Sequence, residues 1–241
     1  MAPSESATTA IELELRAVHR LFAGLSRDMD PEIGLGGKLL YAGALDEAGC
    51  RLVRAANIAG AATLTASADS SVARRAMRDG VIDFVVTTLE EALRILKNEI
   101  RKRQAVAVGV AVAPEIALRE MIELGVLPDL LPPAAMSSGG SARDAEFTAF
   151  LEHGARRIGV PHASQGKMFL TVAVPAAWGQ RLAEFDALLL EYVSTEDHAG
   201  RRWLRFSPRY LGSQARRLRS LECDAETAAR LIERVEQSIP G

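Results

Sequence analysis

Between residues 38 and 131 the chain alternates short apolar segments with segments of helical periodicity, and this alternation constrains the fold more than any other feature. The predicted strands and helices are, in order, 38–44, 46–59, 62–68, 70–79, 81–86, 88–103, 105–112, 114–124 and 129–131. Strands that alternate with helices are typical of right-handed crossovers in a parallel sheet. The sequence therefore predicts an α/β domain in which helices cover both faces of the sheet.

The segments on either side of this region have a different character. Apolar residues recur at helical spacing from Ile11 to Leu25, so we expect an amphipathic helix there. A Pro/Gly/Ser-rich stretch at 132–141 then interrupts the alternation. Beyond it we expect helices at 144–158, 177–192 and 225–239 and strands at 168–174 and 203–206.

These patterns predict three parts. An N-terminal helix occupies residues 1–30, the parallel-sheet domain occupies 31–135, and a smaller α+β part occupies 136–241.

Composition limits the classes of protein that this chain can represent. Hydrophobic residues make up 48% of it, which is ample for a buried core, and the net charge of −2 gives no general attraction to nucleic acid or to an anionic membrane. The acidic, polar start is unlike a signal peptide, and the longest apolar run, 106–113, is too short to span a bilayer. The two cysteines are far apart and lack the spacing of metal ligands. We expect a cytoplasmic protein that does not associate with membranes and for which nucleic acid is not a favoured partner.

The turn between the first predicted strand and its helix carries an unusual pair of acids. In an open α/β sheet this turn holds a ligand's phosphates, because glycines allow close approach and the N–H groups at the helix start favour negative charge. Here the turn reads Gly43-Ala-Leu-Asp46-Glu47-Ala-Gly49. Carboxylates suit the helix dipole but repel a pyrophosphate. The sequence thus predicts a cofactor-type fold with an altered cofactor site.

Several matches in the same order resemble the NAD-binding, Rossmann-like domain of urocanase (urocanate hydratase), from about Gly36 to Leu131. They are the stretch from Gly36 through the Ala-Gly at 59–60, the Leu-Glu-Glu-Ala-Leu at 89–93, the Val-Gly-Val at 108–110 and the Leu-Gly-Val-Leu-Pro-Asp at 124–129. The resemblance implies NAD as cofactor and chemistry in which NAD⁺ acts as an electrophile toward the imidazole of urocanate.

The departures from this family fall on its functional positions. Its glycine-rich turn survives only as Gly43 and Gly49, and its polar segments are replaced by Val112-Ala113 and by residues 132–139. Its cysteine-containing core domain has no counterpart in residues 140–241. The candidate ligand-binding residues, at the ends of the strands, are Gly43, Asp46, Gly49, Ser67, Asp69 and Gly109. Of these, Asp69 is the better match to the acid that would hold a ribose hydroxyl.

We therefore expect a urocanase-like protein that has lost urocanate hydration and acts as a ligand-binding or assembly module, with its cofactor unknown. The alternative is a diverged lyase or oxidoreductase that binds a nucleotide-like or other small ligand at the same edge of the sheet. A third interpretation is binding of phosphate or nucleic acid through the stretch 201–219, which carries seven arginines.

Other candidates have plainer structural explanations. Cys50 suits a small buried position, His153 and His162 lack partners at metal spacing, and residues 164–167 suit a turn. We also expect a homodimer whose contact is supplied by Trp203, Phe206, Tyr210 and the last helix, because aromatic and arginine side chains are enriched at interfaces.

Overall fold

The computed structural model describes residues 5–136, 141–159, 166–212 and 217–237. The chain divides into two compact units, which we call the sheet unit, Val18–Val160, and the second unit, Met1–Ala17 together with Pro161–Gly241. The N-terminal helix α1, Glu5–Leu25, contributes residues to both.

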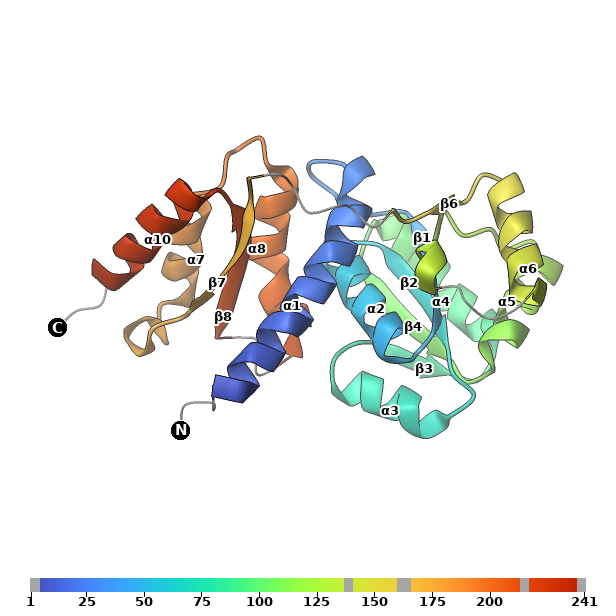
Figure 1. Ribbon diagram of the computed structural model, residues 1–241. Helices are drawn as coiled ribbons and strands as arrows, with labels where there is room; N and C mark the ends of the chain where they lie inside the picture. The colour runs from blue at the N-terminus through green and yellow to red at the C-terminus, as the bar shows by residue number, and fades with distance from the viewer. Residues whose placement is uncertain (1–4, 137–140, 160–165, 213–216, 238–241) are drawn as a thin grey trace. The chain divides into compact units, whose positions relative to one another are not determined.

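The sheet unit is built on six parallel strands in the order β3-β4-β2-β1-β5-β6 (Figure 1). Their bounds are Leu39–Ala44 for β1, Ala62–Ala66 for β2, Phe84–Val86 for β3, Val106–Val110 for β4, Leu130–Leu131 for β5 and Arg156–Arg157 for β6. This arrangement confirms the predicted parallel α/β sheet.

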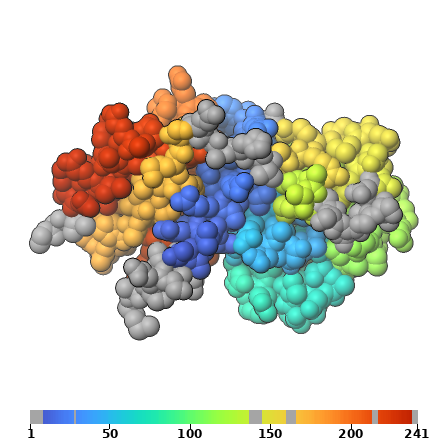
Figure 2. Space-filling model, in the orientation of Figure 1, coloured from blue at the N-terminus to red at the C-terminus, as the bar shows by residue number. Residues whose placement is uncertain are grey.

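Helices cover both faces of this sheet. They are α2 at Glu47–Ala59, α3 at Ser70–Arg78, α4 at Leu89–Lys102, α5 at Pro114–Glu123 and α6 at Ser141–Glu152, with short 3-10 turns at Ser26–Asp28 and Ala134–Met136. One face of the strands packs with α4, α5 and α6 in a single apolar cluster. Since the direction of strand addition reverses between β3 and β4, right-handed crossovers place α2 on the opposite face. Figure 2 shows α2, α3 and α6 exposed on the surface of this unit.

The ends of these helices follow the local sequence signals. Thr88 Oγ1 accepts a hydrogen bond from Glu91 N at 3.3 Å at the start of α4, and Gly60 ends α2 with φ of 95°. The helix predicted at 144–158 is wrong in its last part, because Gly154, with φ of 94°, follows its end and residues 156–157 pair with β5. The parallel sheet consequently continues past residue 135.

The second unit contains most of the predicted smaller α+β part, but not residues 136–160, which belong to the sheet unit. Its antiparallel strands are β7, Met168–Ala173, and β8, Leu218–Cys223, and its helices are α7, Leu182–Leu190, α8, His198–Tyr210, and α10, Ala225–Gln237, with a 3-10 turn at Ala176–Trp178. Its core gathers Phe185, Leu189, Leu204, Leu221 and Leu231.

The strand predicted at 203–206 is wrong, because these residues lie within α8. Asp197 Oδ1 caps that helix by accepting from Gly200 N at 2.8 Å. Trp203 is 0% exposed, and its Nε1 donates to the oxygen of Ser220 at 2.9 Å. Trp203 therefore belongs to the core of the second unit and is not available as the predicted dimer contact.

No described helix combines the length and the apolar character that crossing a bilayer requires.

Candidate functional site

A cavity of about 260 Å³ lies at the carboxyl end of β1. This is the edge at which open α/β sheets bind ligands. Its walls come from β1, the β1–α2 turn, the first half of α5, the 132–136 segment and α6. The lining residues are Tyr41, Ala42, Gly43, Ala44, Asp46, Ala48, Gly49, Pro114, Leu118, Pro132, Ala135, Met136 and Phe147.

Two glycines shape the turn that forms one wall. Gly43 has φ of 81° and lies at an irregularity in the pairing of β1 with β2, where its carbonyl accepts a hydrogen bond from Thr65 Oγ1 at 2.9 Å. A Cβ on Gly49 would lie 1.8 Å from the carbonyl oxygen of Ala44. Gly49 is thus needed for α2 to start this close to the strand.

Asp46 occupies the start of α2. Its Oδ1 accepts a hydrogen bond from Gly49 N at 2.8 Å, and its backbone oxygen accepts one from Cys50 N at 2.8 Å. The neighbouring Glu47 forms an ion pair with Arg51. A carboxylate therefore caps the helix end that would hold a phosphate in a dinucleotide-binding domain.

The start of α5, which also faces the cavity, offers few amides to an anion. Pro114 at its first turn has no N–H, and the amides of Ile116 and Ala117 both donate to the oxygen of Ala113 at 3.0 Å. The hydroxyl of Tyr41 donates to the oxygen of Pro114 at 2.9 Å.

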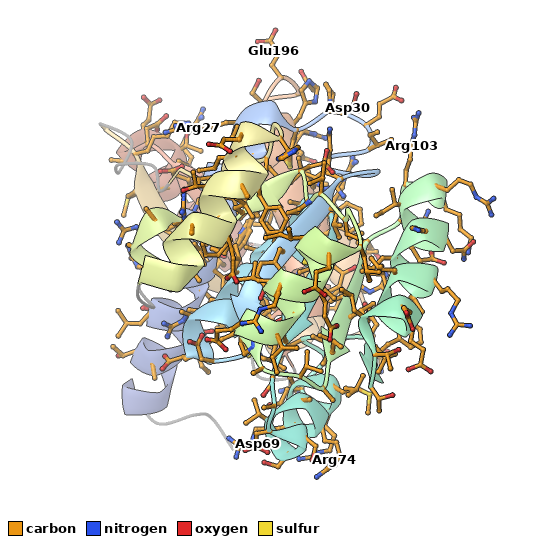
Figure 3. The ribbon with its side chains drawn as sticks, turned by 90° about the vertical axis from the view of Figure 1, so that its right-hand side faces the viewer. Arg27, Asp30, Asp69, Arg74, Arg103 and Glu196 are labelled. Carbon is orange, nitrogen blue, oxygen red and sulfur yellow. The ribbon has the colours of Figure 1, made fainter. Side chains whose placement is uncertain are left out.

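The structure brings together three of the six candidate residues, Gly43, Asp46 and Gly49. Ser67 and Asp69 follow β2 and do not line the cavity. Asp69 instead caps α3, accepting from Ser71 N at 2.7 Å. The Ser71 hydroxyl and amide hold the pKa of Asp69 below its ordinary value. Figure 3 shows Asp69 and Arg74 at the end of the unit opposite Asp30 and Arg103.

Gly109 has a packing role. It is buried within β4, where a Cβ would approach Ile82 Cδ1 to 2.8 Å.

Sequence reasoning missed Tyr41, Leu118, Met136 and Phe147 as lining residues. Only the apolar pattern of their segments was visible in the sequence, and that pattern predicts core as readily as cavity.

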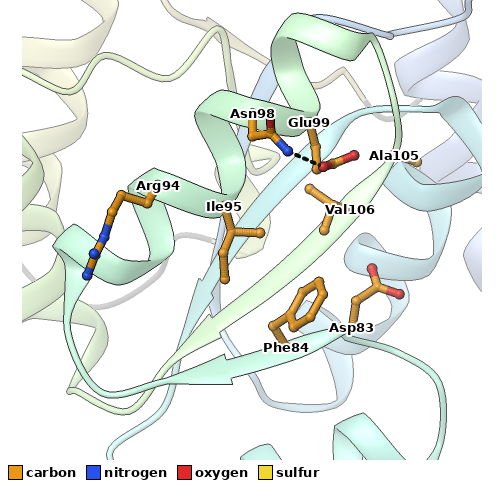
Figure 4. Close-up of a pocket in the computed structure, with 8 residues that line it drawn as sticks. All are labelled: Asp83, Phe84, Arg94, Ile95, Asn98, Glu99, Ala105 and Val106. Atoms are coloured by element: carbon orange, nitrogen blue, oxygen red, sulfur yellow. Dashed lines mark hydrogen bonds between the residues drawn. The ribbon is translucent and has the colours of Figure 1, made fainter.

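A larger hollow of about 750 Å³ lies between β3 and α4 (Figure 4). It includes Asp83, which precedes β3, and Ala105, which precedes β4, so it lies toward the amino ends of the strands. Three of its polar side chains are paired: Asp83 Oδ2 accepts from Ala107 N, and Asn98 Nδ2 donates to Glu99 Oε1, both at 2.8 Å. The cavity at β1 is therefore the stronger ligand-site candidate.

The remaining candidates stand apart from the cavity. Cys50 is half-buried in the first turn of α2, and the ring Nδ1 of exposed His153 lies 2.7 Å from the oxygen of Ala149. His162, Ser164 and Gln165 lie outside the described residues. Across the described ranges, His, Cys, Asp and Glu form no group of three or more able to hold a metal ion.

The arginine-rich stretch is partly used within the second unit itself. Arg219 is buried against Asp186, and Arg201 donates to the carbonyl oxygens of Leu190 and Val193. The guanidinium of Arg202 lies 4.7 Å from the ring centroid of Phe206. These arginines therefore stabilise the unit rather than form one continuous basic surface.

Residues 21–136 match the family model of the urocanase Rossmann-like domain. The matched segment is just under half of the chain, and it contains β1 to β5, α2 to α5 and every lining residue of the cavity at β1 except Phe147.

Proposed function

We propose that this chain, whose residues 21–136 match the family model of the urocanase Rossmann-like domain, is a urocanase-like ligand-binding protein whose ligand is a small molecule other than NAD⁺, and that it does not hydrate urocanate. The observation that carries this proposal is the hydrogen bond from Gly49 N to Asp46 Oδ1 at the N-terminus of α2. The side chain of Asp46 holds the position that a phosphate oxygen would need.

Electrostatics supports the exclusion of a pyrophosphate. Two like charges about 4 Å apart repel by about 1 kcal/mol in water and by about 4 kcal/mol in partly buried surroundings. Among the described residues that line the cavity, none is a lysine, arginine or histidine that could offset such repulsion. A dianionic group at the start of α2 is therefore unfavourable.

Size supports the same proposal. Pockets for drug-sized ligands have volumes of about 300–1,000 Å³. The cavity at β1, at about 260 Å³, lies just below that range. It suits a small molecule better than a whole dinucleotide.

The lining also favours binding over catalysis. Apart from Asp46, the titratable side chain among the described residues of the cavity wall is Tyr41, and its hydroxyl donates to the oxygen of Pro114. General acid–base catalysis uses a group that can exchange a proton with the substrate. One carboxylate oxygen of Asp46 and the hydroxyl of Tyr41 already have structural hydrogen bonds.

Calorimetric titration with NAD⁺, together with the absorbance of added urocanate, tests the proposal. The native protein should show no saturable NAD⁺ binding and no loss of urocanate absorbance. The double variant Asp46→Asn, Glu47→Gln keeps a capping side chain and removes both charges, so it should bind NAD⁺ more tightly than the native protein does. Glu90→Gln, at the exposed start of α4, is the matched control and should behave as the native protein. Micromolar NAD⁺ binding or urocanate turnover by the native protein would contradict the proposal.

A further inference from the structure

We infer that the cavity at β1 binds a small organic cation, with an apolar body and an ammonium or similar group directed at Asp46. This inference rests on the proposed function, since it names the class of ligand for the same cavity. It depends on the charge, the walls and the neighbours of that cavity.

The charge of the lining is one-sided. Asp46 is the one charged residue among the thirteen described residues that line the cavity. Its Oδ1 accepts the capping hydrogen bond from Gly49 N, while Oδ2 accepts none from the residues that the structure describes. A ligand cation can therefore use the second oxygen without breaking the cap, and charge-assisted hydrogen bonds of this type are the stronger kind.

The walls suit an apolar body with a positive group. Leu118, Pro132 and Met136 provide aliphatic surface. The rings of Tyr41 and Phe147 lie with their centroids 6.4 Å apart at an angle of 49°. Aromatic faces attract cations, and this attraction strengthens when the cation is removed from water.

The arginines near the cavity have partners of their own. Arg51 is paired with Glu47. Arg157 packs its guanidinium 4.9 Å from the ring centroid of Phe147 but does not line the cavity. An anionic ligand would find no positive side chain among the lining residues that the structure describes, and the amides of Ile116 and Ala117 at the start of α5 donate to Ala113. Charge complementarity thus favours a cation over a neutral molecule or an anion.

The test uses three probes that share one ring and differ in charge: benzylammonium, benzyl alcohol and benzoate. Amide NMR of the isotopically labelled full chain gives both the affinity and the place of binding, through the shifts of Gly43 and Gly49. Benzylammonium should bind about tenfold more tightly than benzyl alcohol, and benzoate should bind most weakly. Asp46→Asn should lower the affinity for benzylammonium to that for benzyl alcohol, with the melting temperature almost unchanged because asparagine is an equally good cap. Glu47→Gln, one residue away, should leave all three affinities unchanged.

The outcomes separate the inference from the proposed function. Equal or tighter binding of benzyl alcohol or benzoate at Gly43 and Gly49 would overturn the cation inference and leave the cavity as a ligand site. An unchanged benzylammonium affinity in Asp46→Asn would do the same. If no probe shifts these two amides, the ligand site itself is lost, and both proposals fall.

Discussion

Asp46 combines two roles in one side chain: it caps α2 and supplies the charge of the cavity. These roles can be separated chemically, since asparagine keeps the capping oxygen and loses the charge. The same residue that stabilises the fold therefore decides which ligands the cavity accepts.

The capping role predicts a difference between two substitutions at this position. Asp46→Ala should lower the free energy of unfolding by about 1 kcal/mol, whereas Asp46→Asn should change it by only a few tenths. Urea denaturation measures both. If Asp46→Asn is as destabilising as Asp46→Ala, the side-chain hydrogen bond to Gly49 N is not what stabilises the helix start.

Asp69 is expected to make the stability of the sheet unit depend on pH. The Ser71 hydroxyl and amide lower the pKa of Asp69, and a carboxyl whose pKa is lowered by folding stabilises the fold above its unfolded pKa. That stabilisation is lost as the pH falls through the folded pKa. Asp69→Asn should therefore be less stable than the native protein near neutral pH and lose less stability on acidification.

Denaturation at neutral and acidic pH, with Asp79→Asn as the control at the other end of α3, checks this prediction. An equal acid sensitivity in the native protein and Asp69→Asn would contradict it.

At the scale of elements, α8 shows where the sequence was misleading. The sequence predicts a strand at 203–206 and a dimer contact in this stretch, but Trp203, Leu204 and Ser207 are buried together on one face of the helix.

Trp203→Ala should therefore destabilise the second unit by about 3–5 kcal/mol, as truncation of a buried tryptophan does. Phe206→Ala on the same helix is the control, because Phe206 is 37% exposed and should cost much less. Thermal unfolding of the two variants measures both losses of stability. If Trp203→Ala and Phe206→Ala lower the stability by similar amounts, the assignment of Trp203 to the core is contradicted.

The elements that sequence reasoning predicted well are those with local signals. The helices α2, α4 and α5 carry caps, an αL glycine or a first-turn proline in their own sequence, and β2 and β4 are buried apolar runs. β6 and β8 were missed because their residues, such as Arg156 and Arg219, read as exposed. Only tertiary pairing, with β5 in one case and with β7 and Asp186 in the other, makes them strands.

The candidate site likewise contains some residues that the sequence identifies and others that only the fold brings to the cavity. Gly43, Asp46 and Gly49 lie on one turn whose role is visible in the sequence. Phe147 reaches the same cavity from a helix that begins almost a hundred residues later, so its contribution depends on the fold.

At the scale of the whole molecule, the family match covers most of the sheet unit, while α6, β6 and the entire second unit lie outside it. The homodimer stays a prediction, and with Trp203 buried its contact would have to be made without Trp203, by Phe206, Tyr210 and the last helix. Residues 21–136 match the urocanase Rossmann-like domain, and the central proposal is that Asp46 occupies the position at which such a fold would hold a phosphate.

Native mass spectrometry of the freshly purified chain tests this claim most directly, because it reports any cofactor that the folded protein retains. The account predicts a spectrum without NAD⁺, both as purified and after incubation with excess NAD⁺ and gentle desalting. A stoichiometric mass increase equal to NAD⁺, in either sample, would contradict it.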